Sequence, residues 1–382
     1  MKFASLGEIA TIERRSVRPE DICDGTIYVG LENIVSGGDL TSVGTVANGD
    51  LASSKFVFSQ DHILYGKLRP YLAKIAVPDF DGVCSTDILP IRVGQDMDKM
   101  FVAHYLRQSH VVEQANGLAA GANLPRVSPT SLATIQIPML SLLEQRRIAA
   151  ILDKADELRA KRREAIAHLD ALTQSIFHSV FGDPISNNLN WPLEPFGQVT
   201  TSRLGKMLDK KAQTGTHRFP YLRNANVQWF QINTDDLLEM DFSPADQIEF
   251  ALRRGDVLVC EGGEPGRAAV WEEQSPGCYF QKALHRVRPK LDVVHPQYIV
   301  HLLWALANGG GLKDHVTVAT IAHLTGEKLK RMHIPVPPVE LQQTFATRVS
   351  AVERLKETHR KHLVELDALF SSLQSRAFKG EL

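Results

Sequence analysis

Two long stretches of the chain contain neither glycine nor proline and carry apolar residues at helical spacing. The first runs from Leu143 to Phe181 over 39 residues, and the second runs from Val339 to Lys379 over 41 residues. Apolar residues recur in them every three or four positions, the period of one helix face. In the first stretch these residues are Ile148, Ile151, Ala155, Leu158, Ala165, Leu169, Leu172 and Ile176. Because helices of globular proteins average about 11–12 residues, the pattern predicts two exceptionally long helices, each with an apolar stripe to bury.

The two stretches also end in similar sequences. Leu169-Asp170-Ala171-Leu172 in the first recurs as Leu366-Asp367-Ala368-Leu369 in the second, and positions 169 and 366 differ by 197. The same difference relates Ile137 to Ile334, Pro138 to Pro335, Gln145 to Gln342 and His104 to His301. Upstream the difference falls to 193 for Tyr28 and Asn33 against Tyr221 and Asn226, and to 194 for Cys84, Arg92 and Val93 against Cys278, Arg286 and Val287. Self-similarity of this extent indicates two copies of one unit, each a globular part followed by a long helix.

The globular parts alternate short β-like runs with turn residues, as at residues 27–29, 88–93 and 256–260. We therefore predict an α+β fold with domains at residues 1–140 and 186–337 and long helices within residues 141–185 and 338–382. Two such helices in a tandem repeat most simply pack on each other as an antiparallel coiled coil, which would relate the domains by a pseudo-twofold axis. The alternative is that each helix lies on its own globular part.

Composition indicates what kind of protein this is but not what it binds. Lys plus Arg is 43 against 44 for Asp plus Glu, a net charge of −1. A DNA-binding protein needs only a local basic face, so this balance neither supports nor excludes DNA. No apolar run reaches the roughly 18 residues that would span a bilayer. The four separated cysteines, Cys23, Cys84, Cys260 and Cys278, indicate reduced, buried thiols. We expect a cytoplasmic protein with no membrane partner.

Motifs for catalysis or cofactor binding are missing from the sequence. There is no GxxxxGK[ST] loop, no Gly-x-Gly cofactor fingerprint after a strand, and no HExxH or comparable metal-ligand spacing. The Gly-rich stretch from Gly262 to Arg267 contains Glu264, whose charge is wrong for a phosphate site, and it is interpreted as a turn. The sequence therefore predicts no catalytic residue, no metal ligand and no cofactor in this chain, although an active site without a recognisable motif stays an alternative.

The order of these parts resembles the specificity subunit of type I restriction–modification systems over essentially the whole chain. The resemblance rests on Tyr28–Ile34 and its counterpart Pro220–Val227, on the strands that follow Asp61 and Asp256, and on each Ile-Pro followed by a helix start rich in Glu and Gln. Members often have prolines where this chain has Met139 and Leu140. The individual motifs are modest, but their duplicated order is specific.

The resemblance implies a target-recognition domain in each globular part, each reading one half of a bipartite, asymmetric site in double-stranded DNA. It implies that the long helices set the gap between the half-sites and dock two methyltransferase subunits. S-adenosylmethionine would come with those subunits, and ATP and Mg²⁺ with a restriction motor–nuclease subunit. The chain itself would be non-catalytic. Two alternatives stay open: the specificity module of a fused restriction–methyltransferase, and a coiled-coil scaffold that binds protein rather than DNA.

Base edges are read by side chains with paired donors or acceptors, and phosphates are bound by positive charge. On this basis we predict DNA-contacting residues in the loops near the β-like runs. The candidates are Lys67, Arg69, Tyr71, Asn123 and Arg126 in the first domain, and Arg223, Asn226, Arg267, Lys282 and His323 in the second. For each residue an ordinary surface or structural role is the alternative.

Overall fold

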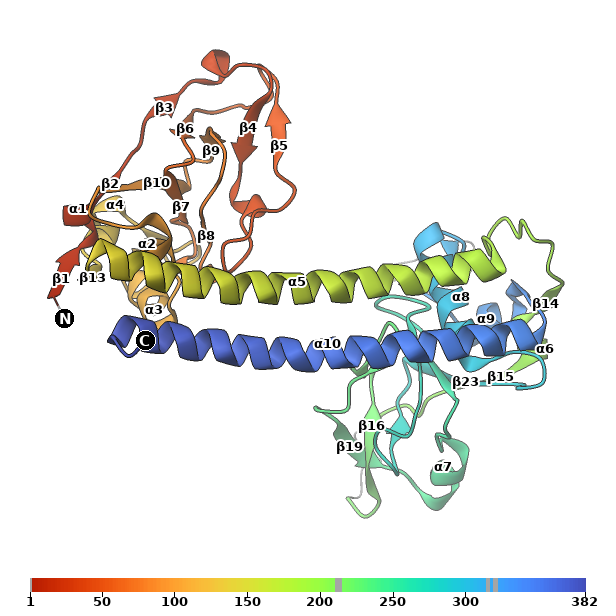
Figure 1. The fold of residues 1–382 in the computed structure, drawn as a ribbon. Coiled ribbons are helices and arrows are strands. Elements are labelled where there is room, and N and C mark those ends of the chain that lie inside the picture. The colour runs from red at the N-terminus through yellow and green to blue at the C-terminus, as the bar shows by residue number, and fades with distance from the viewer. Residues whose placement is uncertain (1, 210–214, 314–316, 319–321) are drawn as a thin grey trace. The chain divides into compact units, whose positions relative to one another are not determined.

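The computed structural model describes residues 2–209, 215–313, 317–318 and 322–382. Its contacts divide the chain into one unit of residues Met1–Arg163 and Lys361–Leu382 and another of residues Glu164–Arg360. Each unit holds one globular domain and a part of each long helix, α5 (Leu142–Phe181) and α10 (Val339–Lys379) (Figure 1). The predicted α+β class and both long helices are confirmed, with α5 starting one residue earlier than expected.

The first unit is built on two sheets. Its strands are β1 (Lys2–Ser5), β2 (Ala10–Ile12), β3 (Ser16–Val17), β4 (Thr26–Val29), β5 (Gly44–Val46), β6 (Lys55–Phe58), β7 (His62–Gly66), β8 (Ile75–Ala76), β9 (Gly82–Cys84), β10 (Ile88–Val93), β11 (Ala119–Ala120), β12 (Arg126–Val127) and β13 (Gln136–Met139). A four-stranded sheet has the order β2-β10-β7-β8, and a five-stranded sheet has the order β3-β6-β9-β4-β5. The alternating pattern of the strands buries a separate cluster on each sheet, around Ile63 on the first and around Phe58 on the second.

Helices cover the four-stranded sheet of the first unit. The helices are α1 (Leu6–Ile9), α2 (Lys99–Leu106), α3 (Ser109–Gly117) and α4 (Pro129–Leu132), with 3₁₀ turns η1 (Pro19–Asp21), η2 (Leu31–Asn33) and η3 (Pro70–Leu72). The Asp98 carboxylate caps α2 by accepting from the Phe101 amide. Phe101 of α2, Ile148 of α5 and Phe378 of α10 are buried in one cluster. The ends of both long helices therefore belong to the core of this domain.

The second unit repeats the plan. Its strands are β14 (Leu193–Pro195), β15 (Thr200–Leu204), β16 (Arg218–Leu222), β17 (Val227–Gln228), β18 (Gln231–Ile232), β19 (Leu238–Asp241), β20 (Val257–Cys260), β21 (Ala268–Val270), β22 (Tyr279–Phe280), β23 (Leu284–Pro289), β24 (Thr317–Val318), β25 (Ala322–His323) and β26 (His333–Pro335). Its helices are α6 (Phe196–Val199), α7 (Pro244–Glu249), α8 (Pro296–Gly309) and α9 (Gly326–Arg331), with the 3₁₀ turn η5 (Asn224–Asn226). The sheet β15-β23-β20-β21 corresponds to β2-β10-β7-β8, and Phe177 and Phe345 of the long helices pack beside Tyr298.

Two buried glutamines show how closely the copies match. The side chain of Gln145 accepts from the Asp98 amide at 2.8 Å and donates to the carbonyls of Asp96 and Leu140. Gln342 accepts from the His295 amide at 2.8 Å and donates to the carbonyls of Val293 and Pro337. All three partners keep the separation of 197 residues. The predicted duplication thus extends to individual hydrogen bonds that fasten each long helix to its domain.

One part of the sequence alignment was wrong. Tyr28 pairs with Val83 across parallel strands, and the matching Tyr221 pairs with Tyr279. Cys84 therefore corresponds to Phe280, two residues beyond Cys278, and Arg92 corresponds to Arg288, two residues beyond Arg286. A slip of two residues keeps every side chain on the same face of its strand, so the apolar pattern could not reveal the error. The cysteine prediction was also wrong at one position, because Cys23 is exposed while Cys84, Cys260 and Cys278 are buried.

Within each unit the parts of α5 and α10 lie side by side in opposite directions. In the first unit Arg159 of α5 contacts Asp367 of α10, and Arg147 of α5 contacts Leu382, three residues beyond the end of α10. The expected apolar seam is only partly buried, because Leu158 is 43% exposed and Leu172 is 45% exposed. The helices pack on their domains as well as on each other. No helix in the described part of the chain is long and apolar enough to cross a membrane.

Candidate nucleic-acid interface

The loop between β7 and β8 brings together three of the predicted residues of the first domain. Arg69 has a φ of 51°, in the left-handed region, and this turns the chain into η3. The Arg69 amide donates to the Pro125 carbonyl at 2.7 Å, and Leu68 forms a bridge with Arg126. The loop therefore lies against the β11–β12 hairpin. Lys67, Arg69 and Arg126 meet there although 59 positions separate the first from the last.

Asp87 holds the basic side chains of this loop. Its carboxylate lies 3.7 Å from Lys67 Nζ and 3.3 Å from Arg126 Nε. The side chains of Lys67 and Arg126 are 24% and 45% exposed. One carboxylate for two cations, with Arg69 exposed beside them, leaves a local positive excess. Such an excess suits a phosphate backbone or the acceptor edge of a base.

The other two candidates of the first domain lie close to this loop. Asn123 is exposed in the segment between β11 and β12. Tyr71 is 51% exposed on η3, and it lines a cavity together with Phe3 and Tyr105. Both side chains are accessible to a ligand. Their roles stay predictions.

In the second domain, His323 occupies the place of Arg126. Gly262 forms a bridge with His323 as Leu68 does with Arg126. The Glu261 amide donates to the Ala283 carbonyl, as the Lys67 amide donates to that of Asp87. His323 and Lys282 are both exposed. The same frame thus presents Glu261 and His323 where the first domain presents Lys67 and Arg126.

Two predicted arginines of the second domain are engaged inside it. Arg267 is 16% exposed and donates to the Glu264 carboxylate at 3.1 Å and to the Asn224 carbonyl at 3.0 Å. Arg223 is 26% exposed and donates to Asp236 at 2.7 Å. These bonds fasten neighbouring loops to each other. A DNA contact by either residue would require part of this bonding to be given up.

Asn226 is the candidate that the structure places farthest from a surface. It is fully buried, its Oδ1 accepts from the Arg223 amide, and its Nδ2 donates to the Asn233 carbonyl and to Asp236. Its counterpart Asn33 closes the same turn by accepting from the Gly30 amide. The structure therefore gives Asn226 a role in the fold, where DNA cannot reach it.

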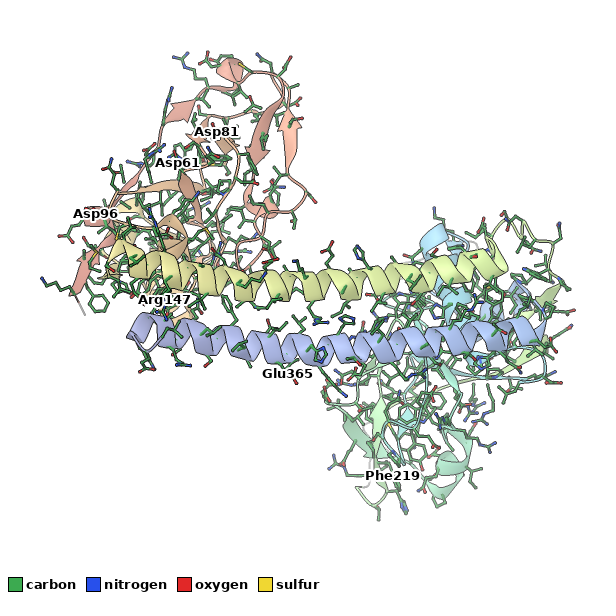
Figure 2. All side chains as sticks on the ribbon, in the orientation of Figure 1. Asp61, Asp81, Asp96, Arg147, Phe219 and Glu365 are labelled. Carbon is green, nitrogen blue, oxygen red and sulfur yellow. The ribbon has the colours of Figure 1, made fainter. Side chains whose placement is uncertain are left out.

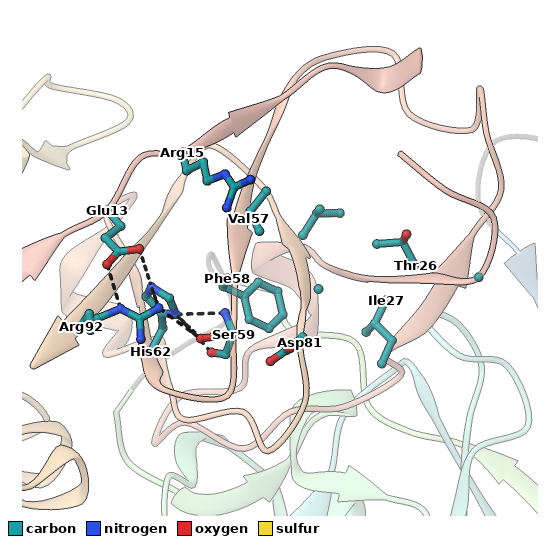
Figure 3. A pocket seen from close by; sticks show the side chains of 13 residues that line it. Glu13, Arg15, Thr26, Ile27, Val57, Phe58, Ser59, His62, Asp81 and Arg92 are labelled. Atoms are coloured by element: carbon teal, nitrogen blue, oxygen red, sulfur yellow. Dashed lines mark hydrogen bonds and ion pairs between the residues drawn. The ribbon is translucent and has the colours of Figure 1, made fainter. Parts of the chain in front are cut away.

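Sequence reasoning missed a polar cavity of about 520 Å³ in the first domain (Figure 3). Glu13 accepts from Arg92 Nε at 2.8 Å, and Glu13 Oε2 lies 3.1 Å from His62 Nε2. Burial raises the pKa of Glu13, but the bonds with Arg92 and His62 outweigh it and hold the pKa below its usual value. Arg15 is exposed at the rim of the cavity. A motif search could not find this site, because its residues come from separate strands.

Two aspartates near this cavity, Asp61 and Asp81, directly precede the strands β7 and β9. Asp61 accepts from Arg92 Nη1 at 3.1 Å, and Asp81 accepts from the Gln60 amide at 2.8 Å (Figure 2). Among the residues that the structure describes, no group of three or more His, Cys, Asp or Glu side chains is placed to hold a metal ion. The geometry suits recognition of a polar surface.

A family model for the type I restriction modification DNA specificity domain matches residues 1–168 and again residues 189–368. The chain belongs to this family. The two matched ranges coincide with the two copies seen in the hydrogen bonds of Gln145 and Gln342. The family assignment and the duplication therefore describe the same organisation of a specificity protein.

Curated relatives carry the same family name. The specificity subunit of the type I restriction enzyme EcoDI of Escherichia coli is 29% identical over 47% of this chain and 40% of its own length. The EcoKI specificity subunit of Escherichia coli K12 is 24% identical over 74% of this chain and 65% of its own length. The chain thus spans less than two thirds of the length of these relatives.

Solved structures share the fold over the whole chain. A chain from a structure of a type I restriction–modification system has a TM-score of 0.60 and 23% identity, covering 100% of this chain and 98% of that one. The S subunit from M. genitalium has a TM-score of 0.60 and 15% identity, covering 99% and 96%. At these identities the likeness concerns the fold.

Proposed function

We propose that the chain is the DNA-specificity subunit of a type I restriction–modification complex, with each globular domain reading one half of a bipartite site. One observation carries this proposal: the two domains share the same backbone framework but expose different side chains on it. Gln145 and Gln342 fasten the two copies identically, whereas Lys67-Leu68-Arg69 is replaced by Glu261-Gly262-Gly263 at the exposed loop. Sequence is read by side chains at base edges, so the two domains read different bases.

The basic loop of the first domain is where we place its DNA contact. Lys67 and Arg126 come from segments far apart in the sequence and share Asp87 as a counter-charge, and Arg69 is exposed beside them. In the second domain, His323 and Lys282 are the exposed candidates at the equivalent place. Arg223 and Arg267 support that loop from within.

We propose further that the long helices separate the readers and dock two methyltransferase subunits. Leu158 of α5 and Leu369 of α10 are 43% and 48% exposed in the first unit. Their counterparts Leu355 and Leu172 are 47% and 45% exposed in the second. Scattered exposed leucines are common, but exposure at matching positions in both copies suits two copies of one partner.

The chemistry would then come from partner proteins in the cytoplasm. Methyltransferase subunits would bring S-adenosylmethionine, and a motor–nuclease subunit would bring ATP and Mg²⁺. This chain would supply only the recognition of the DNA sequence, because its candidate residues are hydrogen-bond donors and acceptors suited to that role.

A domain exchange tests this proposal. Residues 1–140 are replaced by the first domain of a relative, and DNA bound by the complex with its methyltransferase subunits is sequenced. One half of the selected site should change while the other half and the gap stay the same. Change in both halves would show that the domains do not read separately. Methyl transfer by this chain alone, abolished by a point substitution in it, would show that it is an enzyme.

A further inference from the structure

The second unit contains a cavity of about 590 Å³ where α8 meets the parts of α5 and α10. Small-molecule sites have volumes in the range of roughly 300–1,000 Å³ and aromatic or apolar walls with a few placed polar groups. The residues that shape this cavity are Phe230, His301, Trp304, Gln174, Glu353 and Lys356. None of them belongs to the proposed DNA-reading loops.

Phe230 is held in a strained backbone conformation at the wall of this cavity. Its φ is 66°, a region that bulky side chains rarely adopt, at a cost of about 1–3 kcal/mol. The corresponding loop of the first copy carries Gly37 and Gly38, with φ of 98° and 103°, for which the region is ordinary. Strain of this kind persists where the side chain serves a purpose. The second copy keeps an aromatic ring at a place where glycine would fit better.

The ring of Phe230 forms an aromatic wall with its neighbours. It stacks on His301 with ring centroids 4.5 Å apart and planes 25° apart, and it lies 6.3 Å from Trp304. Burial lowers the pKa of His301 to about 3, so this ring is neutral at physiological pH. Flat, uncharged faces of this kind favour a flat ligand by stacking.

Two buried polar atoms beside the wall have no hydrogen-bond partner among the described residues, Nδ1 of His301 and Oε1 of Gln174. Both atoms are buried within the wall, and Nδ1 of His104, the counterpart of His301 in the first copy, has no partner either, so these atoms do not by themselves indicate a ligand. The charges nearby are compensated, because Lys356 lies 2.6 Å from Asp170 and 2.5 Å from Glu353, and Arg360 Nη1 lies 3.8 Å from the same glutamate. The cavity therefore offers aromatic faces for stacking without a net attraction for a strongly charged ligand.

The equivalent cavity of the first unit has a different lining. Arg107 stands where the second unit has Trp304, and Asp39, Asp156, Arg159 and Arg163 are also part of it. Arg107 fills space by donating twice to the Ile75 carbonyl. Phe370 also lines this cavity, but Arg159 covers its ring, so only the second copy presents the neighbouring rings of Phe230 and Trp304.

We propose that the cavity of the second unit binds a planar, uncharged heteroaromatic molecule that stacks on Phe230 and Trp304. This site is separate from the DNA-reading loops. The proposal therefore does not depend on DNA recognition, and the two can fail independently.

Indole signals of the full chain test this directly, with adenine as the probe. The four tryptophans are Trp191, Trp229, Trp271 and Trp304. In chain labelled with ¹⁵N-tryptophan, the Trp304 signal, assigned with Trp304→Phe, should shift saturably as adenine is added. The signals of Trp191 and Trp271, which do not line the cavity, should stay fixed. Cyclohexanol, which is not planar, should give no saturable shift.

Phe230→Gly should weaken adenine binding by about tenfold, because it removes the stacking face. Since the glycine suits the backbone conformation, folding and DNA binding should be kept. Phe219→Leu removes an aromatic ring of the same unit that does not line the cavity, and binding should then be unchanged. The proposal is overturned if Trp304 does not respond to adenine, if cyclohexanol shifts it equally, or if Phe230→Gly binds as tightly as the natural chain.

Discussion

Arg159 of α5 donates to Asp367 of α10 at 2.6 Å, and this bond has an exact repeat in the other unit. There Lys356 of α10 lies 2.6 Å from Asp170 of α5. The third member of each group is also repeated, because Arg159 contacts Asp156 and Lys356 contacts Glu353 three residues earlier on the same helix. In each unit, one cation between two carboxylates therefore links the two helices. We call each of these groups of three charged residues a clamp.

The two clamps should differ in their contribution to stability. Lys356 is 4% exposed, whereas the Arg159 side chain is 19% exposed and also lies over the ring of Phe370. Removing one partner of a buried charge leaves the other poorly compensated. Asp170→Asn should therefore lower the free energy of unfolding by about 1–3 kcal/mol, and Asp367→Asn by about 1 kcal/mol or less.

Urea unfolding followed by circular dichroism measures both losses. Glu365→Gln is the control, because this residue is exposed on α10 (Figure 2) and its substitution should be nearly neutral. Equal losses for Asp170→Asn and Asp367→Asn would mean that burial of Lys356 does not govern the clamp.

The long helices were predictable because they lack glycine and proline over more than three dozen positions, and the fold class followed from the repeat. The clamps were not predictable from the sequence, since Arg159 and Asp367 lie 208 positions apart and only the pairing of the helices brings them together.

The candidate site was predictable in part. Loop residues with donors, such as Lys67 and Arg126, are exposed as expected. Asn226 was chosen for the same donors and is buried, because a short polar side chain can close a turn as readily as it can contact a base. Burial and the partners of a side chain depend on tertiary contacts, so residue type alone could not distinguish these two roles.

Asp87 should limit the affinity of the first domain for DNA. Asp87→Asn removes the carboxylate shared by Lys67 and Arg126, which frees positive charge for phosphates. Binding of the chain to nonspecific duplex DNA should tighten, and the dependence of log K on log salt should become steeper by about one unit or less.

Fluorescence anisotropy over a series of salt concentrations gives both quantities. Asp50→Asn is the matched control, as Asp50 is exposed and contacts the Ala47 amide elsewhere in the same domain. Weaker binding by Asp87→Asn, with an unchanged salt dependence, would place the DNA away from this loop.

His301 should make the second unit less stable in mild acid. Burial lowers its pKa to about 3, whereas an unfolded chain binds the proton at about pH 6.5. Below pH 6.5 protons therefore favour the unfolded chain, and stability falls until the pH approaches the lowered value. Between pH 7 and pH 5 the loss from this residue should be about 2 kcal/mol.

His301→Phe keeps a ring between Phe177 and Phe230 but removes the titration. The difference in unfolding free energy between this variant and the natural chain should grow in favour of the variant as the pH falls. A difference that does not change with pH would show that His301 takes up its proton in the folded chain.

The central claim is that two independent readers are held apart by the long helices. Four helix-favouring residues inserted after Arg163 and again after Arg360 lengthen both connections between the units and leave the contacts within each unit in place. The insertion adds about 6 Å of rise and turns the helix by only about 40° beyond one turn. Base pairs stack at about 3.4 Å.

Selection of bound DNA from a random pool, by the natural chain and by the insertion variant in complex with methyltransferase subunits, tests this claim most directly. We expect two short conserved blocks for both proteins, identical in sequence, with a gap longer by one or two base pairs for the variant. A single continuous block, or an insertion variant that binds DNA and keeps the original gap, would contradict it.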